Sequence, residues 1–358
     1  MNSVTRTVLC ATLFATVALS VVMAQESSDR EASYKLSGEA SVSSIALWSG
    51  DGSDDKVFEA SDILYGSDTA LTLYLDAKRH NIRASFSGRT DIMTGISAPS
   101  PATPTTFLIK RAYLRWTPGS FVVTAGRQLI NWGAAMLWSP ADLFAQTVLT
   151  GLTTERQGTD AIRIAMPLGS LGGIEAVGIP GLSFSTGRYG GRLYGYALGS
   201  DIGLQAARDL ARGETTIAVN IKTDLVLGVW AEASYTFLDD DELKDRFEAI
   251  FGADWSVAYR TIISAEYRYN ARAVPGEDYP AIHYLFASLG TKLGDFVSLG
   301  AGGLIDIANG IVSASLTSAI DVAQDASLAL LAQYSNGQFD SLRLVDAVAI
   351  GATLSLAF

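Results

Sequence analysis

The sequence has few of the residues that build metal and thiol sites. Its 358 residues include one cysteine, Cys10, and two histidines, His80 and His283. Zinc clusters and redox thiols need several such side chains close together, so the composition excludes both kinds of chemistry. We therefore expect no cofactor and no metal.

Charged residues are also scarce, and acidic ones predominate. Only 18% of the residues are charged, and 26 Lys and Arg stand against 37 Asp and Glu, which gives a net charge of −11. Nucleic acid would repel a chain of this charge, so no nucleic-acid partner is expected. In contrast, 48% of the residues are hydrophobic and the mean hydropathy is +0.23, which is unusual for a soluble protein.

The N-terminal residues account for part of this apolar character. Arg6 precedes an uncharged run over residues 7–23, and Val22 and Ala24 are small residues at the positions that signal peptidase requires. Residues 1–24 are interpreted as a cleaved signal peptide, and an uncleaved anchor helix is the alternative. Residues 25–358 then form a single domain.

Proline argues against a transmembrane helix in the rest of the chain. The longest uncharged run, residues 92–109, contains Pro99, Pro101 and Pro104, a composition that neither a helix nor a hydrocarbon environment accepts. An apolar secreted chain without such helices satisfies its backbone hydrogen bonds in lipid only as a closed β-barrel.

The hydrophobic pattern supports a barrel. Leu71, Leu73 and Leu75 alternate with polar residues, and the same period of two recurs in segments of about ten residues along the chain. A soluble β-sandwich alternates in the same way, but the signal peptide, the number of segments and the alternation of short and long connections favour an all-β, transmembrane antiparallel barrel. Eighteen strands are expected, over residues 34–48, 69–78, 80–91, 106–117, 120–128, 159–167, 173–180, 189–198, 201–210, 214–223, 225–237, 246–257, 260–270, 282–293, 296–307, 311–322, 325–335 and 346–358. Treating the weak segments at 173–180 and 189–198 as a loop leaves sixteen.

The last strand ends in an aromatic residue. Ile350, Leu354, Leu356 and the terminal Phe358 share one face of this strand. The strand resembles the C-terminal strands of Gram-negative outer-membrane proteins, which the barrel-assembly machinery recognises. The resemblance implies that Phe358 is the assembly signal and that the protein resides in the cell outer membrane.

The longest connection, residues 129–158, is mostly apolar and rich in amides. A freely solvated surface loop would seldom have this composition. We expect the connection, which follows the fifth strand, to fold inward and constrict the barrel. The alternative is a loop that lies over the rim, or a helical turn in an interface with another chain. The residues expected to form the constriction are Asn131, Trp132, Trp138, Pro140, Asp142 and Phe144.

Short motifs in this region resemble a known family. The first group of motifs consists of Gly126-Arg127-Gln128, Asn131-Trp132-Gly133 and the run from Ser139 to Phe144. Further along the chain follow Arg192-Leu193, Gly199-Ser200-Asp201 and Ala265-Glu266-Tyr267. Together they resemble porin-like outer-membrane barrels that include alginate-export-type channels and their uncharacterised relatives. The resemblance implies a monomeric barrel with a charged lumen and inward loops.

Alternation also assigns charged side chains to the lumen. Arginine is costly toward lipid, so inward placement is favoured, and inward arginines would attract anionic groups. The alternative is that these charges pair across an otherwise empty barrel. The residues assigned to the lumen are Asp76, Lys78, Arg83, Arg89, Arg111, Arg115, Arg127, Arg163, Arg192, Glu232, Glu266 and Arg268. Aromatic residues near strand ends are assigned to an interface belt: Trp116, Phe121, Trp230, Tyr235, Phe237, Tyr267 and Tyr269.

No catalytic constellation is recognisable. His283 and Ser288 are the only local pairing, and five residues along a strand separate them by about 17 Å. The sequence therefore predicts a porin-like channel for small polar or anionic solutes, with outer-membrane lipids and the barrel-assembly machinery as partners. A structural or adhesive surface barrel without an open pore is the alternative.

Overall fold

The computed structural model describes residues 32–49, 63–95, 105–150, 153–181, 183–240, 245–271, 281–339 and 342–358. The expected signal peptide lies outside these residues. The strands are β1 (Ala32–Ser49), β2 (Ile63–Arg79), β3 (Ile82–Gly95), β4 (Thr105–Trp116), β5 (Val122–Gln128), β6 (Gln146–Thr150), β7 (Thr153–Gln157), β8 (Thr159–Pro167), β9 (Gly172–Ile179), β10 (Arg188–Ala197), β11 (Ser200–Asp209), β12 (Glu214–Asp224), β13 (Gly228–Leu238), β14 (Arg246–Val257), β15 (Thr261–Ala271), β16 (Ile282–Leu293), β17 (Val297–Asp306), β18 (Ile311–Ala323), β19 (Ala326–Phe339) and β20 (Leu342–Ala357). A single short 3-10 helix spans Phe184–Thr186 within the described ranges, where no helix has the length and apolar character needed to cross a bilayer.

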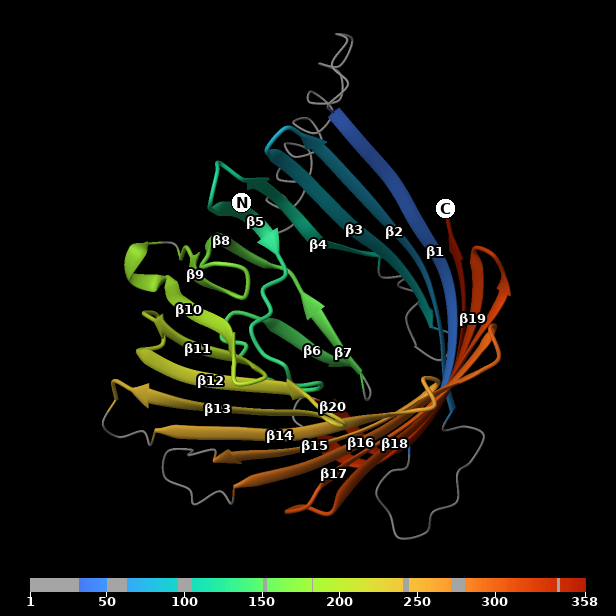
Figure 1. Cartoon of the computed structure of the whole chain (residues 1–358). Helices are drawn as coiled ribbons and strands as arrows, with labels where there is room; N and C mark the ends of the chain where they lie inside the picture. The colour runs from blue at the N-terminus through green and yellow to red at the C-terminus, as the bar shows by residue number, and fades with distance from the viewer. Residues whose placement is uncertain are drawn as a thin grey trace.

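Eighteen of these strands form one closed antiparallel barrel (Figure 1). Each strand pairs with its neighbour along the chain, except that β5 pairs with β8 because β6 and β7 form a separate two-stranded sheet. The pairing of β1 with β20 closes the ring. The prediction of an eighteen-stranded barrel is confirmed. The sixteen-stranded alternative is wrong, because β9 and β10 pair with each other over eight residue pairs despite their glycines.

The barrel closes beside the chain terminus. The amide N–H of Phe358 donates to the carbonyl oxygen of Gly38, and the Gly38 amide donates to the Phe358 carbonyl. The Phe358 ring lies so close to Gly38 that a Cβ at this position would overlap it. Gly38 therefore makes room for the terminal aromatic ring on β1.

Tight turns join the strands at the end of the barrel that holds both described chain termini. Leu198 and Gly199 have φ values of 55° and 78°, and Ala258 and Tyr259 have φ values of 51° and 58°. Two consecutive left-handed residues match the right-handed twist of the flanking strands, which is why two-residue hairpin turns adopt this conformation. Short connections thus gather at one end, as the sequence predicts.

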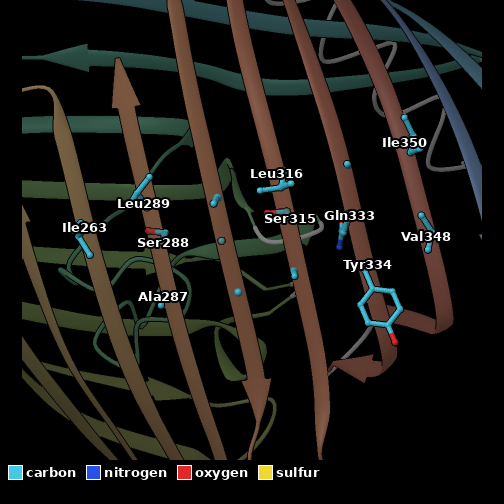
Figure 2. A pocket seen from close by; sticks show the side chains of 15 residues that line it. Ile263, Ala287, Ser288, Leu289, Ser315, Leu316, Gln333, Tyr334, Val348 and Ile350 are labelled. Atoms are coloured by element: carbon cyan, nitrogen blue, oxygen red, sulfur yellow. The ribbon is translucent and has the colours of Figure 1, made fainter. Parts of the chain in front are cut away.

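Side chains alternate between the two faces of the wall. On β13, Trp230, Glu232 and Ser234 are buried, whereas Tyr235 and Phe237 are exposed on the outside. This alternation carries large apolar side chains outward and polar ones inward along most of the wall. Figure 2 shows the wall between β15 and β20, where Leu289, Leu316 and Ile350 border a depression of about 680 Å³.

Candidate functional site

The connection between β5 and β8 lies inside the ring of strands, with β6 and β7 near the middle (Figure 1). We call residues 129–145 the inner segment. The segment is organised by Asp142, whose carboxylate accepts hydrogen bonds from the backbone N–H of Trp132 and of Gly133, the latter at 2.8 Å. Arg156 forms an ion pair with the same carboxylate at 3.3 Å. The segment is thus a compact turn held by its own side chains.

Apolar side chains attach the inner segment to the wall. Trp132 is 2% exposed and Phe144 is 1% exposed, and their rings meet edge to face with 5.0 Å between centroids. Both pack against small wall residues of β8, β9, β11 and β12, namely Ala161, Val177, Ala207 and Ala218. Small wall residues leave the space that the two large rings fill.

A second apolar contact lies further round the barrel. The Trp138 ring stacks on Tyr284 of β16, with 5.1 Å between ring centroids and 22° between ring planes. The guanidinium of Arg268 lies 4.9 Å from the Trp138 ring centroid, in cation–π geometry. Tyr284 therefore has a packing role.

Two wall carboxylates bind the backbone of the inner segment. Glu232 accepts hydrogen bonds from the N–H groups of Ala134, Ala135 at 2.9 Å and Ala141 at 3.3 Å, and from the Ser139 hydroxyl at 2.5 Å. Charged acceptors form the stronger kind of hydrogen bond, and Glu232 is almost fully buried. Glu232 is therefore the main polar anchor of the segment.

Glu266 binds the next part of the segment. Its carboxylate accepts the N–H groups of Met136 at 2.8 Å and Leu137 at 3.3 Å, together with the indole N–H of Trp230 at 3.1 Å. On β9, Glu175 accepts the indole N–H of Trp132 at 2.8 Å. Three inward glutamates on three strands thus hold one segment.

The structure places most of the assigned arginines on the inner face, and several are paired. Arg83 contacts Asp76 at 2.6 Å, Arg163 contacts Glu175 at 2.5 Å and Arg268 contacts Glu248 at 3.1 Å. Arg89 lies between Asp68 and Asp91, at 3.4 and 2.5 Å. Lys78 pairs in register with Arg83 and shares its face.

Four inward arginines form no ion pair with any described residue: Arg111, Arg115, Arg188 and Arg192. The Nε atoms of Arg115, Arg188 and Arg192 are buried without a hydrogen-bond partner among the described residues. Arg188 and Arg192 also lie over aromatic rings, 5.4 Å from the Phe144 centroid and 5.0 Å from the Tyr194 centroid. Arg188 and Arg192 nevertheless face Asp209 and Glu175 across their strand pairs, so Arg111 and Arg115 are the side chains that leave positive charge available inside the barrel.

Arg127 is on the other face, so the prediction that it lines the lumen is wrong. Thr124 and Gln128 on β5 are buried on the inner side, and Arg127 therefore points outward by alternation. It binds Asp160 of β8 at 2.9 Å and donates to the Ile109 carbonyl at 3.2 Å, where β3 and β4 shift register. Within the inner segment, Ser139 donates to Glu232 and Asp142 accepts the N–H of Gly133.

Trp230 also differs from the expectation, since it is buried inside the barrel rather than exposed in a belt. It lies two residues before Glu232 on the same strand, and residues two apart share a face, so this spacing predicts its inward position. Trp116, Phe121, Tyr235 and Phe237 are exposed on the outside. Glu175 and Arg188 are also on the inner face, and the same alternation along β9 and β10 would have predicted both positions.

His283 and Ser288 lie on opposite faces of β16. Tyr284 and Phe286 are buried inside, which puts Ser288 inward and His283 outward. His283 Nδ1 is 2.6 Å from the Tyr267 hydroxyl, and its ring packs edge to face against Tyr269. The two residues therefore cannot form a catalytic pair.

Comparison with known proteins gives matches among solved structures alone. No family model matches the chain, and no curated protein matches it. OccAB4 of Acinetobacter baumannii superposes with a TM-score of 0.61 at 9% identity, covering 90% of this chain and 98% of that chain. OccK11 (OpdR) of Pseudomonas aeruginosa superposes with a TM-score of 0.60 at 8% identity, covering 91% of this chain and 96% of that chain. The outer membrane protein opdK of the same organism superposes with a TM-score of 0.59 at 7% identity, covering 90% of this chain and 99% of that chain.

The chain shares the fold of these barrels. Identities below one tenth show the fold alone, and the resemblance to alginate-export-type channels stays a prediction.

Proposed function

We propose that the protein is an outer-membrane channel that passes small polar solutes, with a preference for anions, through a lumen narrowed by the inner segment. The observation that carries the proposal is a closed barrel whose inner wall binds a folded segment through Glu175, Glu232 and Glu266. A barrel that served only as a membrane anchor would need no segment folded into its lumen, whereas a channel uses a constriction to select its solutes.

The preference for anions is supported by the inward arginines that form no ion pair with a described residue. Glu175, Glu232 and Glu266 accept hydrogen bonds from the inner segment, whereas Arg111, Arg115, Arg188 and Arg192 form no ion pair with a described residue. Unpaired guanidinium groups in a pore attract carboxylate, sulfate and phosphate groups.

A sealed barrel with a structural or adhesive role is the second candidate. The observation that favours it is the close packing of the inner segment, in which Ala141, Trp132 and Phe144 are almost completely buried. A segment packed in this way on all sides would close the lumen to solutes.

The partners expected of such a barrel are outer-membrane lipids, the barrel-assembly machinery and the solute, and we propose that it acts as a monomer. The exposed ring of Phe358 beside Gly38 leaves the C-terminal aromatic group on the outside of the barrel, where an assembly factor would reach it.

Planar-bilayer recording separates the two candidates. The purified protein should give discrete conductance steps after reconstitution, whereas a correctly folded preparation without steps would support the sealed barrel. The matched variant lacks residues 131–150, and it should conduct in either case because the emptied barrel has an open lumen. This variant therefore shows that the assay detects the barrel.

A further inference from the structure

A cavity of about 530 Å³ lies against the inner face of β17 to β20 and β1. Its polar lining consists of hydroxyl and amide side chains, and none of its lining residues is charged. Ser44 and Ser318 are also in the lining, but alternation puts their side chains on the outer face. We call the inward polar set the hydroxyl wall: Ser43, Ser298, Ser315, Thr317, Gln333 and Thr353.

Strand alternation and hydrogen bonding place these side chains inside the barrel. Thr353 on β20 donates to the Ser43 hydroxyl on β1 at 3.0 Å, so the two share one face. Leu316 lies between Ser315 and Thr317 along β18 and is 64% exposed on the outside, which puts its two neighbours inward. Gly300 faces Thr317 across the β17–β18 pair, and a Cβ there would overlap the Thr317 hydroxyl oxygen. Gly300 thus keeps space beside a hydroxyl group.

The hydroxyl wall is separate from the surfaces already described. The anchoring glutamates and the apolar contacts of the inner segment lie on β8 to β17 and at Ile311, the first residue of β18. The arginines Arg83, Arg89, Arg111 and Arg115 lie on β3 and β4. Inward charges also occur on β1, β17 and β18, at Lys35, Glu39, Asp306 and Asp321, but none of them lines the cavity. The cavity is therefore an uncharged patch of the inner face.

We propose that this cavity binds the neutral, hydroxyl-rich part of a solute, that is, a small sugar or polyol. Hydroxyl and amide groups both donate and accept, as a sugar hydroxyl requires of its partners. Ile45 and Leu331 in the same lining offer apolar contact to the carbon-bound hydrogens of a sugar ring. The volume is within the range of small-molecule sites, about 300 to 1,000 Å³. The proposal rests on the channel function, since it names a solute class for the same lumen.

Binding of maltose to the purified protein in detergent tests the proposal. Isothermal titration should show saturable binding to the wild type, and binding should weaken at least tenfold in the double variant Ser315→Ala, Thr317→Val. Thr317→Ser keeps the hydroxyl and should bind like the wild type. Thr69→Val, on the outer face of β2, is the matched control and should also bind normally.

Arg111→Ser tests whether this site is independent of the arginines on β3 and β4, and it should leave maltose binding unchanged. Absence of saturable maltose binding to the wild type would overturn the proposal, as would equal binding to the double variant that still shows the heat-dependent gel mobility of a folded barrel. The channel function has its own test, because its failure would be the absence of conductance steps in a planar bilayer, whereas maltose binding is measured in detergent.

Discussion

Replacing Glu232 by alanine should release the inner segment from the wall. The carboxylate accepts three backbone N–H groups and the Ser139 hydroxyl. A hydrogen bond to a charged group contributes about 1.5–3 kcal/mol. If lumen water replaces two of the four bonds, the loss of the other two amounts to about 3 kcal/mol at the lower bound. At about 1.4 kcal/mol per tenfold change, the detached fraction of the segment should rise on the order of 150-fold.

Thiol labelling measures this detached fraction. Ala141 is 0% exposed in the segment, so a thiol introduced by Ala141→Cys in a Cys10→Ser background should react slowly with a bulky maleimide. Adding Glu232→Ala should accelerate labelling about 150-fold, in proportion to the detached fraction. Glu232→Gln keeps one acceptor oxygen and should give an intermediate rate.

The control for this experiment is Glu214→Ala. Glu214 is also an inward glutamate, but it pairs with Arg246 at 2.8 Å. Labelling at position 141 should be unchanged in this variant. An acceleration of less than about threefold in Glu232→Ala would refute the role of Glu232 as the main anchor, because losing even one charged hydrogen bond should exceed it.

Three further predictions concern the pore, its charge and its assembly. Deleting residues 131–150 should raise unit conductance severalfold in the same salt solution, and an unchanged value would place the segment outside the conduction path. Arg111→Ser with Arg115→Ser should lower anion preference in a reversal-potential measurement, whereas Arg127→Ser should not, because its side chain faces outward; equal effects would contradict the assignment of faces. Removing the Phe358 ring by Phe358→Ala should reduce the yield of heat-modifiable barrel in the membrane, and a normal yield would show that the ring is not an assembly signal.

The strands could be predicted closely from the sequence because a period of two is a local property. The expected segments at 246–257 and 282–293 coincide with β14 and β16, and the weak segments at 173–180 and 189–198 are β9 and β10. The alternation of apolar and polar residues depends only on residues next to one another, and turn residues mark where the strands end. The closure of β1 on β20 follows from counting an even number of strands.

The site was less accessible to sequence reasoning because its contacts are distant along the chain. The apolar composition of residues 129–158 pointed to an inward fold, but nothing local links Ala135 to Glu232 across 97 positions. Charge alone predicts inward placement of Arg127, and this prediction is wrong. Thr124 and Gln128 on the same strand are buried on the inner side, so Arg127 faces outward by alternation. The ion pair with Asp160 offsets the cost of this outward charge.

The reversal potential of the full-length channel tests the central claim most directly. In a planar bilayer with a tenfold KCl gradient, ideal selectivity for one ion gives about 59 mV. The unpaired arginines predict discrete conductance steps and a reversal potential displaced toward the chloride equilibrium value. Conductance steps with a reversal potential displaced toward the potassium equilibrium value would contradict the anion preference. A folded barrel that gives no conductance steps would contradict the channel function itself.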